Sequence, residues 1–255
     1  MDSPSKIGSA IARLGGNLVK LWGSLYHTIS PGKRWQIRSE GAVKQNGAGN
    51  SIPLIIWQTN FTDMVSLPMI ANHRRNRRLA QEFEYRYVST EEREQYLRAY
   101  APTEVLAAYL RLTDGAAQAD LWRCFVLYRE GGVYMDIDAS LVRGLWPVIQ
   151  GRNQIFIRNY GEFTNFFMAT CPNNPIFKEF LDEIVKNIRE HTPANSKGVY
   201  GTTGPGALKA VLERHPEVQF VAHQKICVQG AFTNEHFQYI DRPRSKWTYK
   251  KTFME

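Results

Sequence analysis

Two aspartates, Asp136 and Asp138, are the residues whose type and spacing most directly suggest chemistry. They fall in segment 133–139, where apolar and polar residues alternate as in a β-strand with one face turned to a core. Carboxylates at positions i and i+2 of a strand share a face and lie roughly 6.5 Å apart at the backbone. Like charges this close are unfavourable without a cation, and carboxylate oxygens suit Mn²⁺ or Mg²⁺. The pair predicts a divalent metal site; the alternative is that one aspartate caps a turn and the other is solvated.

A second polar pair, Asp120 and Arg123, precedes the aspartates. Segment 116–128 is apolar nearly all round at helical length, which is typical of a buried helix. Residues three apart share a helix face, and charges in a buried setting need strong partners. The pair is therefore either an ion pair within the helix or two polar arms that reach a ligand.

The elements that must position these side chains alternate between strands and helices. The predicted helix ends at Gly131-Gly132, since glycine favours the left-handed turn that closes helices. The other segments predict an α/β sandwich. Strands are expected at residues 52–59 and 85–88, and helices at 69–81, 91–100 and 103–112.

The N-terminal segment forms an amphipathic helix in this interpretation. Apolar residues recur in steps of three and four over residues 7–29, with Lys6, Arg13 and Lys20 among them. Such a helix either lies on an anionic membrane or packs on its own core or on a second subunit. We expect an appendage at residues 1–34, a linker at 35–51 and a catalytic domain at 52–255.

Composition narrows the class of protein without selecting a partner. The chain has 255 residues and 43% hydrophobic content, enough for a full core. A net charge of +8 favours an anionic partner, whether a nucleic acid, a phospholipid surface or a phosphate-bearing substrate. Three widely spaced cysteines and the absence of a long apolar run or a signal core predict a cytoplasmic protein.

The polar pairs together resemble a known family. The array Asp120-x-x-Arg123, followed by Gly131-Gly132-x-Tyr134-x-Asp136-x-Asp138, is similar to the signature of the family-32 glycosyltransferases with the D-x-D motif, and to the core of the large clostridial glucosylating toxins. The resemblance implies a GT-A-type, Rossmann-like mixed sheet flanked by helices. It also implies that Asp138 binds the metal directly, that Asp136 shares the ion and touches the ribose, and that Asp120 and Arg123 bind donor-sugar hydroxyls. Tyr134 belongs to the same donor site.

Other segments extend the resemblance over residues 52–247. Segment 52–59 resembles the family's opening strand, and Trp57 stands where a toxin tryptophan stacks on uracil, although core packing is the alternative. Asn165 lies in an N-x-x-x-A segment like the family's, and residues 202–206 resemble its TGP turn. Ser245-Lys246-Trp247 is similar to the toxins' S-x-W, which implies that Ser245 completes the metal shell and that Trp247 contacts the diphosphate.

These features predict a metal-dependent glycosyltransferase, with Asp136 and Asp138 as its catalytic residues. The donor is expected to be a UDP- or GDP-sugar, and the acceptor a glycan or lipid-linked glycan, as in bacterial surface polysaccharide synthesis. The resemblance implies retention of anomeric configuration. We expect a place at the inner face of the cytoplasmic membrane, a homodimer as the alternative for the N-terminal helix, and no nucleic-acid partner. The alternatives are a metal-dependent nuclease or phosphotransferase, an effector that glycosylates a protein, and an inactive binding module.

Overall fold

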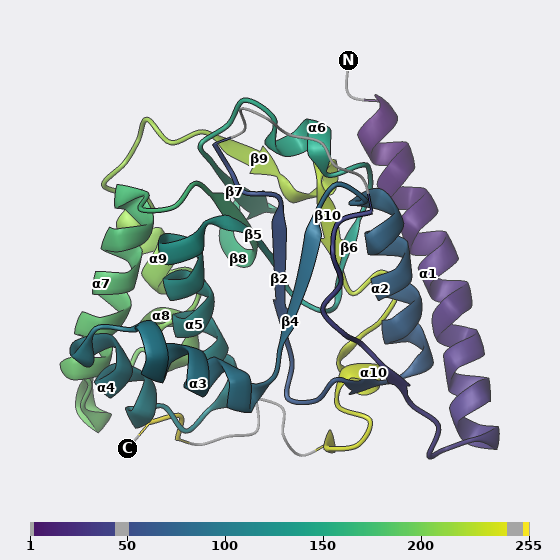
Figure 1. Ribbon diagram of the computed structural model, residues 1–255, viewed down its shortest axis with the longest axis horizontal. Coiled ribbons are helices and arrows are strands. Elements are labelled where there is room, and N and C mark those ends of the chain that lie inside the picture. The colour runs from purple at the N-terminus through teal and green to yellow at the C-terminus, as the bar shows by residue number, and fades with distance from the viewer. Residues whose placement is uncertain (1–2, 44–50, 244–251, 255) are drawn as a thin grey trace.

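A mixed β-sheet organises the chain. The computed structural model describes residues 3–43, 51–243 and 252–254, and within these ranges the sheet has six strands in the order β4-β2-β5-β8-β7-β9 (Figure 1). β2 pairs in parallel with both β4 and β5, whereas β8 is antiparallel to β5 and β7. The strands are β2 (Ile55–Thr59), β4 (Glu84–Val88), β5 (Gly132–Met135), β7 (Gln154–Asn159), β8 (Glu162–Thr170) and β9 (Phe220–Ala222).

Helices cover both faces of this sheet and enclose a hydrophobic core on each side. Figure 1 shows α3, α4, α5, α7, α8 and α9 on one side and α1, α2 and α10 on the other. The predicted helices and strands are confirmed, with ends shifted by a few residues. The helices are α2 (Leu67–Leu79), α3 (Thr90–Tyr100), α4 (Thr103–Arg111), α5 (Gly115–Glu130), α6 (Trp146–Ile149), α7 (Pro175–Arg189), α8 (Gly198–Thr202), α9 (Pro205–Leu212) and α10 (Glu235–Gln238), with short 3₁₀ turns at Pro193–Asn195 and His223–Lys225.

Local sequence explains where the central helix α5 begins and ends. Asp114 caps its first turn by accepting hydrogen bonds from the backbone N–H groups of Ala116 and Ala117. Gly131 follows it with φ of +68°, a conformation open to glycine. A side chain at Gly131 would also meet Pro172 and the carbonyl of Thr170 at 2.8 Å. The chain therefore passes directly from α5 into β5, the strand that leads to the aspartates.

The strand predicted to carry the aspartates, β5, is shorter than expected and ends before them. Tyr134 faces the α5 core and Val133 and Met135 face the opposite core, as the alternation indicated. The ladder ends where the N–H of Asp136 donates to Phe166, and the chain then turns, with the N–H of Ala139 donating to the carbonyl of Asp136. Asp136 and Asp138 thus lie in a turn between β5 and the next strand. That strand, β6 (Ala139–Leu141), pairs with β10 (Cys227–Gln229) in a separate ribbon.

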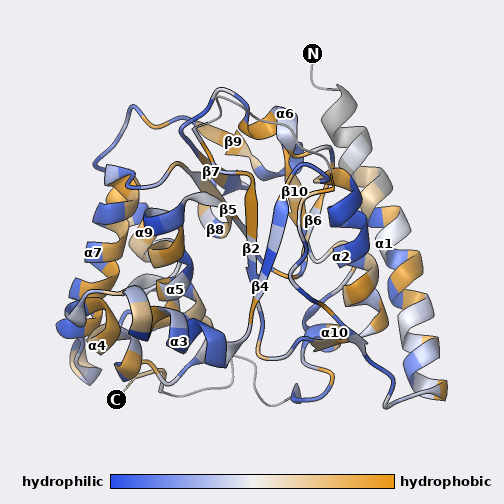
Figure 2. Ribbon diagram, viewed as in Figure 1, coloured by the Kyte–Doolittle hydropathy of each residue, from blue (hydrophilic) through white to orange (hydrophobic). Residues whose placement is uncertain are grey.

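Helix α1 (Ser3–Ile29) packs on the body through its small residues. Ala12 lies in a small cluster with Val228, Ala231 and Phe232, and Gly16 and Gly23 are buried. Six large apolar residues of α1 are exposed, so this part of the stripe does not pack on the catalytic domain. Figure 2 shows hydrophobic and hydrophilic residues alternating along α1. The side chains of Ile7 and Ile11 lie outside the described residues. The outward residues, with exposed fractions from 52% to 75%, are Leu14, Leu18, Leu21, Trp22, Leu25 and Ile29.

The segment expected to be a linker is packed on the domain over its first part. β1 (Trp35–Gln36) pairs with β3 (Met64–Val65), and Ile37 is buried. Glu40 exchanges two backbone hydrogen bonds with Tyr85 of β4, both 2.8 Å long. Residues 35–43 therefore extend the edge of the fold, and residues 44–50 lie outside the described ranges.

The packing of α1 yields a matched pair of substitutions. Gly16→Ala should lower the free energy of unfolding by about 1–3 kcal/mol, because the new Cβ would lie 2.0 Å from the carbonyl oxygen of Ala231. Gly15→Ala meets only Phe232, at 3.8 Å, and should stabilise the helix by up to about 1 kcal/mol. Urea unfolding of the two variants measures both effects; equal stabilities would contradict this packing.

Candidate active site

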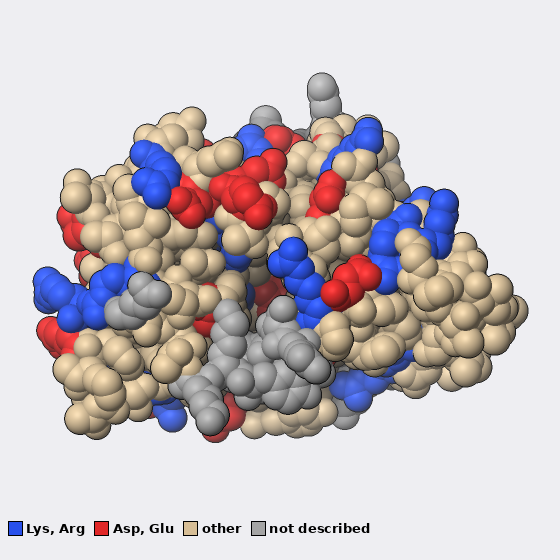
Figure 3. All heavy atoms as spheres, turned by 90° about the horizontal axis from the view of Figure 1, so that it is seen from below, with Lys and Arg blue, Asp and Glu red and all other residues tan. Residues whose placement is uncertain are grey.

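A cleft lies where the parallel strands end. β2 is flanked by β4 on one side and β5 on the other, so the strand order reverses at β2, and open α/β sheets bind ligands at such a point. The cleft has a volume of about 400 Å³. Figure 3 looks onto this lower edge of Figure 1, where acidic side chains lie in a hollow. The lining includes Asn60 and Phe61 after β2, Thr90 and Arg93 after β4, and Asp136 and Asp138 after β5.

The two aspartates converge in this cleft as the sequence predicts. The side-chain amide of Gln229 on β10 donates to Asp136 Oδ2 at 3.4 Å and to Asp138 Oδ1 at 3.2 Å. Burial and the neighbouring Asp136 carboxylate raise the pKa of Asp138 to about 7. No Lys or Arg among residues 3–43, 51–243 and 252–254 forms a salt bridge with Asp138. The pair is therefore only partly neutralised by the protein.

Arg123 connects α5 to the first of these aspartates. Its Nη1 lies 3.3 Å from Asp136 Oδ1 and donates to the backbone carbonyl of Asn165 at 3.0 Å. Its guanidinium carbon lies 4.3 Å from the ring centroid of Tyr134, a cation–π distance, and the Tyr134 hydroxyl donates to the same Asp136 oxygen at 2.8 Å. Burial opposes the charge of Arg123, but Asp136, Tyr134 and Asp120 raise its pKa overall. Arg123 and Tyr134 thus hold Asp136 in one orientation.

Asp120 lies behind this layer and is fully engaged by the protein. It is 6% exposed and accepts hydrogen bonds from Asn165 Nδ2 and Thr203 Oγ1, both at 3.0 Å, while Arg123 Nη2 lies 3.3 Å away. Burial raises its pKa to about 6. The ion pair within the helix is present, and neither Asp120 nor Asn165 lines the cleft. Their direct contact with a donor sugar stays a prediction.

Trp57 has the surroundings of a core residue, the alternative offered by the sequence. It is 3% exposed, and its indole N–H donates to the carbonyl of Gly131 at 3.0 Å. Trp122 packs edge-on at 6.2 Å between centroids, and Arg86 covers the ring at 4.8 Å. Trp57 does not line the cleft. Its position on β2 points it toward α5, because it pairs in register with Tyr134.

Phe61, Tyr239 and Gln229 line the cleft and are absent from the sequence predictions. Phe61 stacks on Tyr239 with centroids 5.7 Å apart, and Arg242 lies 5.3 Å over Phe61. Gln229 and Thr203 hold the aspartates but come from segments far along the chain. The TGP-like turn was the available signal for Thr203; Gln229 had none. The two remaining predicted site residues, Ser245 and Trp247, lie outside the described residues.

The carboxylate pair fits a divalent cation that also binds a ligand. Within the described ranges, no group of three or more His, Cys, Asp or Glu side chains could hold a metal alone. Mg²⁺ and Mn²⁺ need no such cage, since they keep waters and substrate phosphates as ligands beside one or two carboxylates. Asp136 and Asp138 both offer an oxygen to the Gln229 amide, and a cation could take the same two oxygens.

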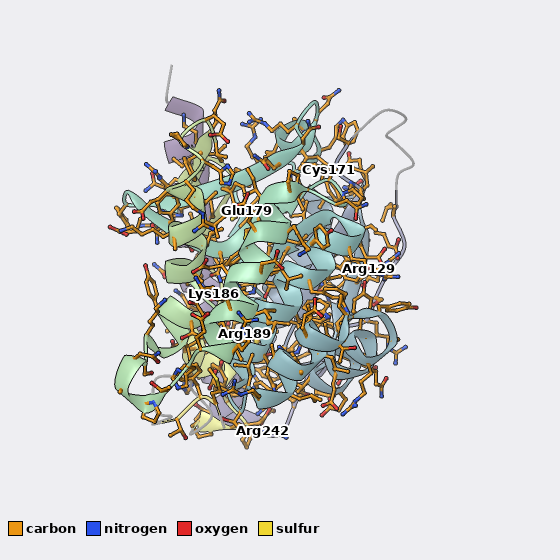
Figure 4. All side chains as sticks on the ribbon, turned by 90° about the vertical axis from the view of Figure 1, so that its left-hand side faces the viewer. Arg129, Cys171, Glu179, Lys186, Arg189 and Arg242 are labelled. Atoms are coloured by element: carbon orange, nitrogen blue, oxygen red, sulfur yellow. The ribbon has the colours of Figure 1, made fainter. Side chains whose placement is uncertain are left out.

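A larger cleft of about 720 Å³ lies between α4 and α7, away from this chemistry. Glu179, Lys186 and Arg189 lie along this face, shown in Figure 4, and Arg242 lies at its lower end beside the first cleft. Some of its charges are paired, for example Arg214 with Glu179 at 3.6 Å. The two clefts share no lining residue, so the carboxylate pair defines the candidate site.

Comparisons with known proteins agree with this assignment. Residues 42–160 match the family described as a glycosyltransferase sugar-binding region containing the DXD motif. Inositol phosphoceramide mannosyltransferase 3 of Schizosaccharomyces pombe (strain 972 / ATCC 24843) is 23% identical over 199 residues, which cover 75% of this chain and 54% of that protein. The chain therefore spans about half the length of this curated relative.

Solved structures support the fold. The PaToxG glycosyltransferase superposes with a TM-score of 0.51 at 18% identity, covering 84% of this chain and 82% of that one. The ligand-free glycosyltransferase domain of the YGT toxin has a TM-score of 0.43 at 14% identity, covering 61% and 55%, which is too distant to argue from. The GT-A-like mixed sheet flanked by helices is confirmed.

Asp138→Asn tests the charge pair through stability. The pKa of Asp138 is raised in the folded state, so its stabilising contribution is complete below the unfolded value of about 3.9 and is lost as the pH rises through about 7. In EDTA, the variant should therefore gain melting temperature relative to wild type at pH 8.5, and gain less at pH 5.5. Mn²⁺ should raise the melting temperature of wild type at pH 8.5 and leave the variant unchanged. An equal Mn²⁺ shift in both proteins would contradict the metal assignment.

Proposed function

We propose that the chain, whose residues 42–160 match the glycosyltransferase sugar-binding region containing the DXD motif, transfers a sugar from a UDP- or GDP-sugar to a glycan or lipid-linked glycan. The observation that carries the proposal is the convergence of Asp136 and Asp138 in the cleft at the strand-order reversal. A bound Mn²⁺ or Mg²⁺ would stabilise the negative charge of the departing nucleoside diphosphate.

The protein's own residues supply orientation in this scheme. Arg123 and Tyr134 hold Asp136, and Asp120 holds Arg123 through the ion pair within α5. Asn165 and Thr203 in turn fix the carboxylate of Asp120. This layered support keeps the carboxylates positioned without rearrangement at the moment of reaction, which is the condition for electrostatic catalysis. We take retention of anomeric configuration from the resemblance to family-32 enzymes.

The nuclease alternative has less support. Metal nucleases and phosphotransferases commonly use two ions about 3.5–4 Å apart. The described residues offer no group of three acidic or other metal ligands beside the two aspartates. One ion shared with a diphosphate suits a pair of carboxylates better.

We further propose that the enzyme works at an anionic membrane, docked by the outer face of α1. Residues 3–29 contain Lys6, Arg13 and Lys20 and no Asp or Glu. No helix of the described residues is long and apolar enough to cross a bilayer. A helix with an apolar face and only basic charges suits the interface of an anionic bilayer.

The charge of α1 supports a membrane rather than a second copy of the chain. Two copies would bring together helices with no acidic residue to pair with the exposed Arg13, whereas anionic lipid complements this charge; the ammonium group of Lys20 donates to the carbonyl of Gly230 instead. The name of the curated relative states mannose transfer to inositol phosphoceramide, a membrane lipid, which supports a lipid-borne acceptor. We therefore propose that the protein acts at the inner face of the cytoplasmic membrane; a role in surface polysaccharide synthesis remains a prediction from the sequence.

Donor turnover tests the proposed reaction. Incubation with Mn²⁺ and a panel of UDP- and GDP-sugars, GDP-mannose included, should release free nucleotide with sugars of one base and none in EDTA. Asp138→Asn should lose about 100-fold or more of this rate, since a Lewis-acid contribution of several kcal/mol would be removed. Failure of every donor to bind or turn over, or cleavage of single-stranded RNA or DNA instead, would contradict the proposal.

Vesicle co-sedimentation tests the membrane proposal. The full chain should pellet with phosphatidylglycerol vesicles at low salt and stay in the supernatant with phosphatidylcholine alone. Leu18→Gln combined with Leu21→Gln should abolish pelleting, because both leucines are more than half exposed on the outer face. Leu110→Gln, at a leucine of α4 that is 47% exposed, is the matched control and should bind as wild type. If the full chain does not pellet with vesicles but forms a dimer, and the double variant does not, then the outer face of α1 binds a second copy of the chain and the membrane proposal is wrong.

A further inference from the structure

Arg93 is a buried cation in the wall of the cleft, and no carboxylate of the described residues forms a salt bridge with it. It lies in the first turn of α3 and is 3% exposed, yet its side chain belongs to the cleft lining. Its guanidinium donates to two neutral oxygens, Thr90 Oγ1 at 3.0 Å and the carbonyl of Gly115 at 3.3 Å. Its Nε finds no hydrogen-bond partner in the described part of the chain, and burial lowers its pKa. The protein thus leaves a buried positive charge uncompensated, which is costly.

The neighbouring arginine shows the contrast. Arg123 lines the same cleft, but its charge is balanced by Asp120 and Asp136, each 3.3 Å away. The positive charge of Arg123 is close enough to lower the pKa of Arg93 further. Across the described ranges, Arg93 forms no salt bridge with any acidic side chain. A ligand that brings acceptor oxygens to this wall would supply the missing partner.

We propose that Arg93 is a donor-binding residue that takes an acceptor oxygen of the nucleoside diphosphate. The inference rests on the proposed function and deepens it. Arg93 follows β4 and its guanidinium touches the start of α5, so it lies at the reversal of strand order where a nucleotide binds. A guanidinium carries five N–H donors and no acceptor, which suits a phosphate oxygen or the keto oxygen of uracil or guanine. The exocyclic amino groups of adenine and cytosine would face it with a second donor.

A purely structural role for Arg93 makes a different prediction. In that case, the bonds to Thr90 and Gly115 would tie α3 to α5, and their loss would unfold the protein more easily. If instead Arg93 binds a ligand, replacing its uncompensated buried charge with an apolar side chain should leave the free energy of unfolding of the ligand-free protein unchanged or raise it. Stability without ligand and affinity for nucleotide therefore separate the two roles.

Titration calorimetry with Mn²⁺ tests the proposal in the full chain. Arg93→Met should weaken binding of UDP or GDP, whichever wild type prefers, by about 10- to 100-fold, the value of a charged hydrogen bond. Arg93→Lys should recover part of the affinity, because it keeps the charge. Arg98→Met is the matched control on the same helix, since Arg98 is 54% exposed and paired with Glu94 at its surface. It should bind as wild type, and the melting temperature of ligand-free Arg93→Met should not fall.

A comparison of pyrophosphate with nucleoside diphosphates identifies the ligand oxygen that Arg93 binds. If Arg93→Met weakens pyrophosphate binding as much as it weakens UDP or GDP binding, the partner is a phosphate oxygen. If it weakens only nucleoside diphosphate binding and reduces the preference for UDP or GDP over ADP and CDP, the partner is a base oxygen. Both results support donor binding. A folded Arg93→Met variant that binds its nucleotide as tightly as wild type overturns the inference and leaves the proposed function standing. Wild-type protein that binds no nucleoside diphosphate at all contradicts the proposed function itself.

Discussion

Repulsion between Asp136 and Asp138 is the constraint around which the site is built. The two carboxylates come together at the end of a buried strand, and Asp138 keeps a raised pKa there. Arg123 compensates one of them, whereas no Lys or Arg of the described residues forms a salt bridge with Asp138. In the function that we propose, a divalent ion and its anionic ligand would bind together, because each neutralises charge that the other leaves.

The sheet holds this arrangement at a distance from solvent. Arg123 comes from α5, Asn165 from β8 and Thr203 from the turn after α8, and all three converge because β5 lies beside β8 with α5 packed over it. Each buried polar group finds a partner in this network, which is what makes it tolerable in a low-dielectric interior. Arg93 departs from that pattern, because its Nε has no hydrogen-bond partner among the described residues, and for this reason we propose that it binds a ligand.

Helix α1 packs on the body in a different way from the elements of the catalytic core. Its contact with the body runs through Gly16 and Gly23, where a side chain would collide with Ala231 or Pro68. Close approach of this kind, to backbone at Gly16 and to the Pro68 ring at Gly23, needs no large apolar residue, so large apolar residues stay exposed on the outer face. The inner face of α1 fits closely against the body, whereas its outer face is apolar and exposed. One helix can therefore pack on the fold and bind a second surface.

The sequence alone determined the elements and the carboxylate pair. Periodicities of two and of three to four residues are local, so they predicted β2, β4, β5, α1 and α5 and placed Asp136 and Asp138 together. The tertiary structure alone decided which partners meet. Trp57 enters the core because of its register with Tyr134, Asp120 is held by Thr203 from 83 residues away, and the stripe of α1 faces outward because glycines make the closer contact. These outcomes depend on packing between distant segments, and no local pattern encodes that packing.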